Sequence, residues 1–145
     1  MAAKILLIQG ANMTWLGRRQ PEIYGTATAA ELDALINRHA ARLGCDLAIH
    51  YTHIEGEAIA RLYQGIEDGI DGLIMNPAGF TYSGFALRDA ILGCTDLPYV
   101  EVHIGNLEKR GMKSALANAA IGVVAGFGLD SYRLGLEAMV AHLDR

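Results

Sequence analysis

Lys4-Ile-Leu-Leu-Ile8, followed after a short interval by Asn12-Met-Thr-Trp-Leu-Gly-Arg-Arg-Gln-Pro-Glu-Ile-Tyr-Gly25, is the stretch that decides the fold. The apolar run predicts a first strand, and Thr28 marks the start of a helix. The connection between them is longer than usual, which is typical of a lid or a binding loop. The alternative is an ordinary solvated loop of turn residues. Because ligands of open α/β sheets bind at the carboxyl ends of the strands, we favour a functional loop in which Arg18 or Arg19 lies beside Tyr24.

The length of the chain predicts a single domain over residues 1–145. Hydrophobic residues make up 52% of it, a high share. This surplus suggests surface buried between subunits, although an apolar α/β sheet would also raise the figure. No run of about 18 apolar residues occurs, and no basic-then-apolar leader opens the chain. We therefore expect a cytoplasmic protein without a membrane segment.

Charge and cysteine content exclude several classes of partner. The net charge is −4 and no basic stripe occurs, so nucleic acid is disfavoured as a partner. Cys45 and Cys94 share no motif spacing, which favours two small buried apolar residues over a disulfide or a metal pair. Histidines and carboxylates also lack metal-ligand spacing, and no P-loop is present. We expect neither a metal nor a cofactor.

Apolar runs alternate with helical patterns from end to end, which predicts parallel strands joined by crossover helices. The predicted strands lie near 4–10, 45–51, 72–76, 97–103 and 120–126. The predicted helices lie near 28–44, 55–66, 83–93 and 130–143, with a further short helical piece within 104–118. This order predicts a three-layer, doubly wound α/β fold of flavodoxin-like type, with a five-stranded parallel sheet of order 2-1-3-4-5.

Local signals support three of these helices. Thr28-Ala-Ala-Glu31 has the spacing of a capping box, and Gly44 is placed to end the same helix. Ser83 is a candidate cap for the third helix. In the second helix the spacing of Ile59, Leu62 and Tyr63 predicts a buried face.

Polar residues close three of the predicted strands. Asn12 follows the first strand, Asn76 ends the third, and Glu101 and His103 end the fourth. The predicted strand order places these strand ends side by side. We therefore expect one crevice to be surrounded by Arg19, Tyr24, Asn76 and His103. A lone histidine is more often structural, but a histidine in this company at the ligand edge of a sheet favours a site.

The chemistry that such a set supports is proton transfer. A neighbouring arginine favours the phenolate form of Tyr24, which could then remove a proton α to a carbonyl. Asn76 could steady the developing enolate, directly or through water, and His103 could give a proton to a leaving hydroxyl. Asp89, on the helix after the third strand, is a solvated or helix-pairing charge unless subunits pack there.

At these residues the sequence resembles the type II 3-dehydroquinate dehydratases, collinearly over nearly the whole chain. The matching segments are Gly10-Ala-Asn12, Leu16-Gly-Arg-Arg-Gln-Pro21, Glu22-Ile-Tyr-Gly25, Glu55-Gly-Glu57, Asn76-Pro77, Ala86-Leu-Arg-Asp-Ala90, Glu101-Val-His103, Asn106 and Gly126-Phe-Gly-Leu-Asp-Ser-Tyr132. The resemblance implies a flavodoxin-like subunit in a dodecamer built of trimers, without metal or cofactor. It also implies a hydro-lyase that converts 3-dehydroquinate to 3-dehydroshikimate through an enolate.

The resemblance also implies roles for individual residues. Tyr24 would be the base, Arg19 its activator, Asn76 the holder of an enolate-stabilising water and His103 the general acid. Asn12 and Glu101 would position these groups, residues 17–24 would form a mobile lid, and Asp89 would reach the site of a neighbouring subunit. Further substrate-binding positions would be Tyr82, Ile104, Gly105, Arg110 and Lys113.

Departures from the family pattern concern the recognition of the substrate. Tyr82 stands where the family has a substrate-binding histidine, and Gly105 stands where it has a serine. The loop after Asn106 is short and offers Arg110 and Lys113 where the family has more arginine; lysine cannot make a planar bidentate contact.

Three interpretations follow. The leading one is dehydration of 3-dehydroquinate, in the shikimate pathway or in quinate catabolism. The second is a relative that uses the same base and acid on another cyclic or carboxylated hydroxyketone, because a lost hydrogen bond in a polar pocket can change specificity strongly. The third is a non-catalytic homologue.

Overall fold

The computed structural model describes residues 1–94 and 96–145 and contains one sheet of five parallel strands. The strands are β1 (Lys4–Ala11), β2 (Asp46–Tyr51), β3 (Gly72–Ala78), β4 (Tyr99–His103) and β5 (Gly122–Ala125). Their order is β2-β1-β3-β4-β5, and every neighbouring pair is parallel. This confirms the predicted flavodoxin-like topology and the placement of the second strand at an edge.

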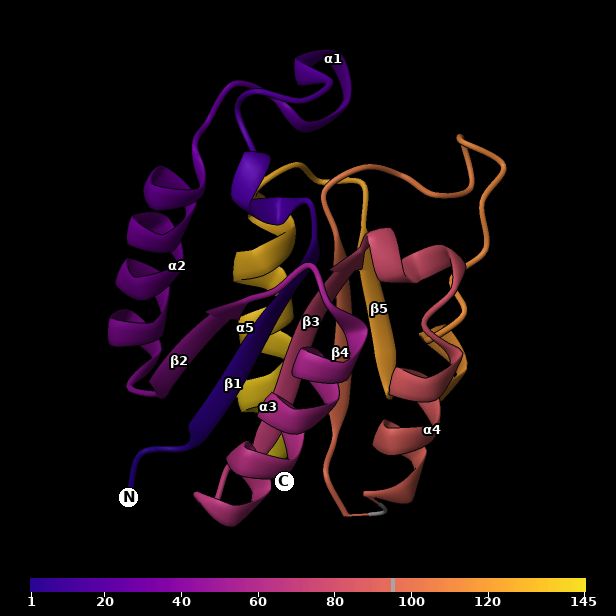
Figure 1. The fold of residues 1–145 in the computed structure, drawn as a ribbon. Coiled ribbons are helices and arrows are strands. Elements are labelled where there is room, and N and C mark those ends of the chain that lie inside the picture. The colour runs from indigo at the N-terminus through magenta and orange to yellow at the C-terminus, as the bar shows by residue number, and fades with distance from the viewer. Residues whose placement is uncertain (95) are drawn as a thin grey trace.

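Helices cover both faces of the sheet and make three layers (Figure 1). The α-helices are α1 (Pro21–Tyr24), α2 (Ala29–Leu43), α3 (Glu55–Glu67), α4 (Phe85–Gly93) and α5 (Asp130–Leu143). Short 3-10 helices lie at Met13–Trp15, Gly79–Tyr82 and Ala117–Ala119. Among the described residues no helix is both long and apolar enough to cross a membrane.

The core is divided into two halves by the alternation of side chains along β1. Ile5 and Leu7 point to the face covered by α2 and α5, whereas Leu6 and Ile8 point to the face covered by α3 and α4. All four are buried. A central parallel strand is apolar on both faces because each face is covered, which is why the run Ile5–Ile8 shows no alternation of polar residues.

The predicted start and end of α2 are confirmed. Thr28 Oγ1 accepts a hydrogen bond from the Glu31 backbone N–H at 3.1 Å and donates to the Glu31 carboxylate at 3.3 Å. This satisfies one of the free amides of the first turn. Gly44 ends the helix with a φ of 72°, the left-handed conformation that glycine adopts without strain.

Two local predictions are wrong. Tyr63 is 51% exposed, and the buried residues of α3 are Ala58, Leu62 and Gly65. The predicted helical period is right, but the buried face of α3 is centred on other residues than predicted. It includes the small residues Ala58 and Gly65, and Gly65 allows α3 to pack closely on β1. Ser83 does not cap α4, because a 3-10 turn precedes the helix and the helix begins after Gly84 without a side-chain cap.

β1 and β3 approach each other closely where the chain leaves the sheet. A Cβ atom on Gly10 would lie 2.0 Å from the carbonyl oxygen of Pro77. The obstacle is backbone, which cannot rotate away, so only glycine fits. This contact fixes the ends of both strands.

Gly10→Ala should therefore lower the free energy of unfolding by about 3 kcal/mol, within the range for an overpacked core position. Urea denaturation followed by circular dichroism measures the change. Gly56→Ala is the matched control, because a Cβ atom at this position on α3 meets no atom within 4 Å. It should stabilise the protein by about 0.5–1 kcal/mol through helix propensity. Equal stability of the two variants would contradict the close-approach argument.

Candidate active site

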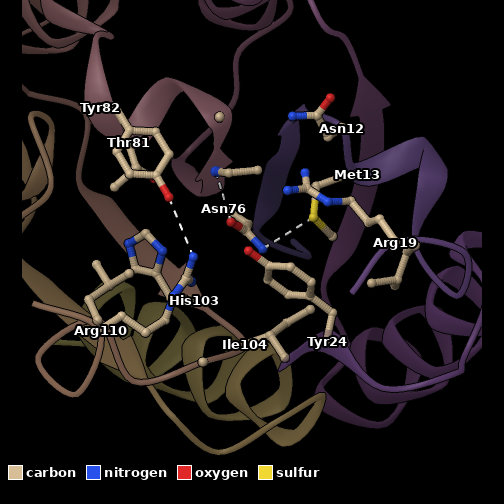
Figure 2. A pocket seen from close by; sticks show the side chains of 15 residues that line it. Asn12, Met13, Arg19, Tyr24, Asn76, Thr81, Tyr82, His103, Ile104 and Arg110 are labelled. Atoms are coloured by element: carbon tan, nitrogen blue, oxygen red, sulfur yellow. Dashed lines mark hydrogen bonds between the residues drawn. The ribbon is translucent and has the colours of Figure 1, made fainter. Parts of the chain in front are cut away.

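A pocket opens at the carboxyl ends of β1, β3 and β4 (Figure 2). Its lining residues are Asn12, Met13, Leu16, Arg19, Tyr24, Asn76, Ala78, Gly79, Thr81, Tyr82, His103, Ile104, Gly105, Leu107 and Arg110. Most of the residues predicted to form a site are thus brought together. Three predicted residues do not line the pocket: Glu101 is buried, and Asp89 and Lys113 are exposed.

Tyr24 is held between two guanidinium groups. Arg19 Cζ lies 5.2 Å from the centre of the Tyr24 ring, and Arg110 Cζ lies 5.7 Å from it. The Tyr24 hydroxyl points into the pocket (Figure 2). Both guanidinium groups are within cation–π distance of the ring and bring fixed positive charge beside the phenol. Sequence reasoning found Arg19 but did not place Arg110 beside the ring.

In the segment that carries Tyr24, the half-buried Tyr24 ring packs against the core. α1 has only four residues, begins with Pro21 and ends at Gly25, whose φ is 80°. Gln20 before it has a φ of 38°, an uncommon conformation for a residue other than glycine. No residue of 17–25 is buried. These features agree with a lid hinged at both ends, which stays a prediction.

Asn76 lies near the carboxyl end of β3, and its amide is held at both ends. Its Oδ1 accepts a hydrogen bond from the backbone N–H of Ala78 at 3.0 Å, and its Nδ2 donates to Tyr132 Oη at 2.8 Å. The other acceptor near Nδ2 is Met13 Sδ at 3.6 Å, a weak acceptor. Asn76 is only 4% exposed. One N–H of Nδ2 is therefore only weakly engaged by the protein at the pocket.

A polar pair lies beneath Asn76. Tyr132, from α5, donates its hydroxyl hydrogen to Gln9 Oε1 of β1 at 2.7 Å. Both residues are buried, and burial raises the pKa of Tyr132, so its hydroxyl stays protonated. Sequence reasoning missed this pair. A glutamine inside the apolar first strand was the available signal.

His103 is oriented by a buried carboxylate. Its Nε2 lies 2.8 Å from Glu101 Oε2, and Glu101 Oε1 accepts the hydroxyl hydrogen of Tyr99 at 2.7 Å. Glu101 is fully buried beneath the pocket wall. Burial and the neighbouring Glu101 raise the pKa of Tyr99, so the donor to Glu101 stays protonated. With Nε2 engaged, Nδ1 is the ring nitrogen of His103 that can donate to a ligand.

Tyr82 and Arg110 meet across the mouth of the pocket. Arg110 Nη2 donates to Tyr82 Oη at 3.4 Å, and the Tyr82 hydroxyl donates to Met112 Sδ at 3.2 Å (Figure 2). Figure 2 shows the first of these two bonds, and Met112 is not drawn there. The Tyr82 hydroxyl thus joins the segment after β3 to the loop after β4. At Gly105 a Cβ atom would have its nearest neighbour, Ile23, at 3.7 Å, so the position is open.

Asn12 adopts a left-handed conformation with a φ of 80° at the end of β1. Its backbone N–H donates to His53 Nδ1 at 2.9 Å, and His53 Nε2 lies 3.1 Å from Thr14 Oγ1. Acceptance by Nδ1 places the proton of the neutral imidazole on Nε2. His53 therefore holds the turn that leads into the lid, a role that sequence reasoning did not assign.

Asp89 and Lys113 are exposed and do not line the pocket. Asp89 is on α4, its side chain is 68% exposed, and it pairs with Arg88 at 3.1 Å. Lys113 is exposed on the loop after β4. Their contacts with a substrate or a neighbouring subunit stay predictions. No group of three His, Cys, Asp or Glu side chains suited to a metal ion occurs in the described part of the chain.

A flavodoxin-like sheet with a pocket of ionisable groups at its carboxyl edge defines an α/β protein with an enzyme-type site. A sequence model of the family described as dehydroquinase class II matches residues 3–140. The chain belongs to this family.

Similar proteins agree with that placement. The 3-dehydroquinate dehydratase of Xanthomonas campestris pv. campestris (strain 8004) is 42% identical, over 99% of this chain and 98% of its own length. The crystal structure of a type II dehydroquinase from Propionibacterium acnes has a TM-score of 0.90 and 32% identity, covering 97% of this chain and 98% of that one. The type II dehydroquinase from Butyrivibrio crossotus DSM 2876 also has a TM-score of 0.90, at 29% identity, covering 95% and 97%.

Proposed function

We propose that this protein is a hydro-lyase that dehydrates 3-dehydroquinate to 3-dehydroshikimate. One observation carries the proposal: a phenol between two guanidinium groups faces, in one pocket, the amide of Asn76 and a histidine bound to a buried carboxylate. These groups match the three requirements of a stepwise dehydration next to a ketone, namely a base, an enolate stabiliser and an acid. Membership of the dehydroquinase family and the names of the similar proteins support the choice of substrate.

In the first step the Tyr24 phenolate removes a proton from the carbon next to the ketone. Arg19 and Arg110 supply the positive charge that compensates the phenolate before transfer. The C–H electron pair moves into the ring and the carbonyl oxygen becomes an enolate oxygen. The weakly engaged N–H of Asn76 stabilises this oxygen, directly or through a bound water.

In the second step the enolate expels the β-hydroxyl group. The imidazolium form of His103 donates the Nδ1 proton to the departing oxygen, which leaves as water. Glu101 compensates the imidazolium charge at 2.8 Å and holds the ring in place. The proton on Tyr24 then returns to solvent, and His103 is reprotonated, so the protein ends each turnover unchanged.

Asn12 and Ile104 line the pocket with Gly105, and we assign them to positioning and to contacts with the substrate ring and carboxylate. Gly105 offers its backbone N–H where the family has a serine hydroxyl. The dodecamer of trimers, the approach of Asp89 to a neighbouring site and the cytoplasmic location stay predictions. Sedimentation velocity measures the first of these directly.

A direct assay tests the function. The product is a conjugated enone, so purified protein mixed with 3-dehydroquinate should produce a rising ultraviolet absorbance. The second candidate function is the same chemistry on another cyclic hydroxyketone, favoured by Tyr82 and Gly105 at the recognition wall. Turnover of such a compound together with none of 3-dehydroquinate, at high enzyme concentration, would replace the proposed substrate.

Tyr82→His tests the recognition wall. Histidine restores the residue that the family resemblance implies at this position, and it frees Arg110 from the contact at 3.4 Å. We expect KM for 3-dehydroquinate to fall by about threefold to tenfold, with kcat changed by less than about threefold. Tyr63→His, at an exposed position on α3, should leave both constants unchanged. If both constants of Tyr82→His also equal those of wild type, position 82 does not read the substrate.

A further inference from the structure

The Asn76 amide has two possible orientations, and they present opposite chemistry to the pocket. With Nδ2 toward Tyr132, the group left for the ligand is an N–H donor; with Oδ1 there, it is a lone pair. Only the donor stabilises an enolate oxygen. Something in the protein must therefore select between two orientations of nearly equal shape.

Local backbone contacts supply half of the selection. The N–H of Ala78 needs an acceptor and finds Asn76 Oδ1 at 3.0 Å. Tyr132 alone supplies no preference at the other end, because a hydroxyl can accept a hydrogen bond from Nδ2 or donate one to Oδ1.

Gln9 removes that ambiguity because, in the structure, its amide presents Oε1 and not Nε2 to Tyr132. Its Oε1 lies 2.7 Å from Tyr132 Oη and can only accept, so it takes the single hydroxyl hydrogen of Tyr132. Tyr132 is then left with lone pairs toward Asn76 and must meet an N–H there. The pKa of Tyr132 is raised by burial, which keeps this hydrogen on the phenol.

We propose that Gln9 and Tyr132 are positioning residues that fix the Asn76 amide with an N–H toward the pocket. The inference rests on the proposed function for its catalytic consequence, but not for the orientation itself. It also gives a reason for a fully buried glutamine in β1, whose Nε2 has no hydrogen-bond partner among the described residues. A buried donor without a partner destabilises the folded state. We infer that Gln9 is nevertheless present because Oε1, at the other end of its amide, accepts the hydrogen of Tyr132.

Reversal of the amide would disrupt the whole set. Oδ1 would face Tyr132, which would have to turn its hydrogen away from Gln9 Oε1. The Ala78 N–H would meet the amide NH2 group. Loss of the Gln9 acceptor alone leaves Tyr132 free to donate to Asn76. The preference for one orientation of the Asn76 amide is then weaker, although Asn76 itself is unchanged.

Two variants test this in the full-length protein. Gln9→Met removes the acceptor, and Tyr132→Phe removes the hydroxyl. Each should lower kcat for 3-dehydroquinate by about 10- to 100-fold, less than the loss of a complete oxyanion donor, with KM changed by less than about threefold. Ser131→Ala is the control: it removes a buried hydroxyl from the adjacent position of α5, where Ser131 Oγ accepts from the Phe127 N–H at 3.1 Å. It should reduce thermal stability similarly while leaving kcat within about twofold.

Neutron diffraction from deuterium-exchanged wild-type crystals supplies a readout that does not depend on turnover. Two deuterons should appear on the Asn76 atom that contacts Tyr132, and the Tyr132 deuteron should point to Gln9. Deuterons on the atom that faces Ala78 would overturn the inference. So would wild-type kcat in Gln9→Met and Tyr132→Phe, or a loss that Ser131→Ala reproduces. If either variant fails to fold, the other one and the neutron structure decide. A wild-type protein that does not dehydrate 3-dehydroquinate ends the proposed function, and the deuteron positions still decide the orientation.

Discussion

Tyr24→Phe should lower kcat for 3-dehydroquinate by about 10²- to 10⁴-fold, the usual contribution of a general base. The substitution removes one oxygen and keeps the ring between Arg19 and Arg110, at 5.2 and 5.7 Å from the two guanidinium carbons. Because the ring remains, the pocket should keep its shape and KM should change by less than about threefold. The initial rate of enone absorbance measures the loss.

The control for this variant is Tyr63→Phe, which removes a hydroxyl from an exposed tyrosine on α3. Its kcat should equal that of wild type. A Tyr24→Phe variant that keeps more than about one tenth of wild-type kcat would assign the base to another residue. The pocket offers no second phenol except Tyr82, whose hydroxyl is bound to Met112 and contacted by Arg110.

His103→Gln should lower kcat by a similar factor, about 10²- to 10⁴-fold, because it removes the group that protonates the departing hydroxyl. Glutamine is preferred to alanine for this test. Its amide N–H can still donate to Glu101, whereas alanine would leave a fully buried carboxylate without this partner and would destabilise the fold. Stopped-flow and steady-state absorbance measure the loss, and thermal unfolding verifies that the variant remains folded.

Partial reaction offers a sharper readout for the same variant. If His103 acts only as the acid, Tyr24 should still exchange the substrate's α-proton with deuterated solvent, which proton NMR detects without dehydration. His142→Gln, near the end of α5, should leave kcat unchanged. Loss of both exchange and dehydration in His103→Gln would indicate that His103 also organises the proton abstraction.

The sheet could be predicted because its signals are local. Each strand is a short apolar run, and Thr28 and Gly44 mark both ends of α2 by backbone chemistry alone. The prediction for Tyr63 is wrong because the helical period alone does not say which side of α3 faces the core. Small residues such as Ala58 and Gly65 share the buried face, and the apolar pattern does not reveal them. Ser83 is not the cap of α4 because a 3-10 helix at Gly79–Tyr82, with Phe80 and Thr81 buried, precedes α4, which begins only after Gly84.

The main residues of the pocket could also be predicted, because parallel strands bring their carboxyl ends to one edge. Arg19, Tyr24, Asn76 and His103 all line it. The supporting contacts could not be predicted. The bond between Gln9 and Tyr132 spans 123 positions in the sequence, and that between Asn12 and His53 spans 41. No spacing rule reaches across such separations, so these partners emerge only from the folded chain.

Helix α1, which carries Tyr24, has only four residues. The Tyr24 ring packs half-buried against the core, but no residue of the segment is fully buried, so the interior of the protein fixes the reactive oxygen only in part. If residues 17–24 form the predicted lid, we expect contacts with the substrate to order them as the substrate bridges the lid and the opposite wall at Tyr82 and Gly105. Remote hydroxyl and carboxylate groups of the substrate therefore act on turnover as well as on affinity. Ring ketones that lack these groups should bind and yet react slowly, because they do not hold the phenol oxygen of Tyr24 in position for proton removal.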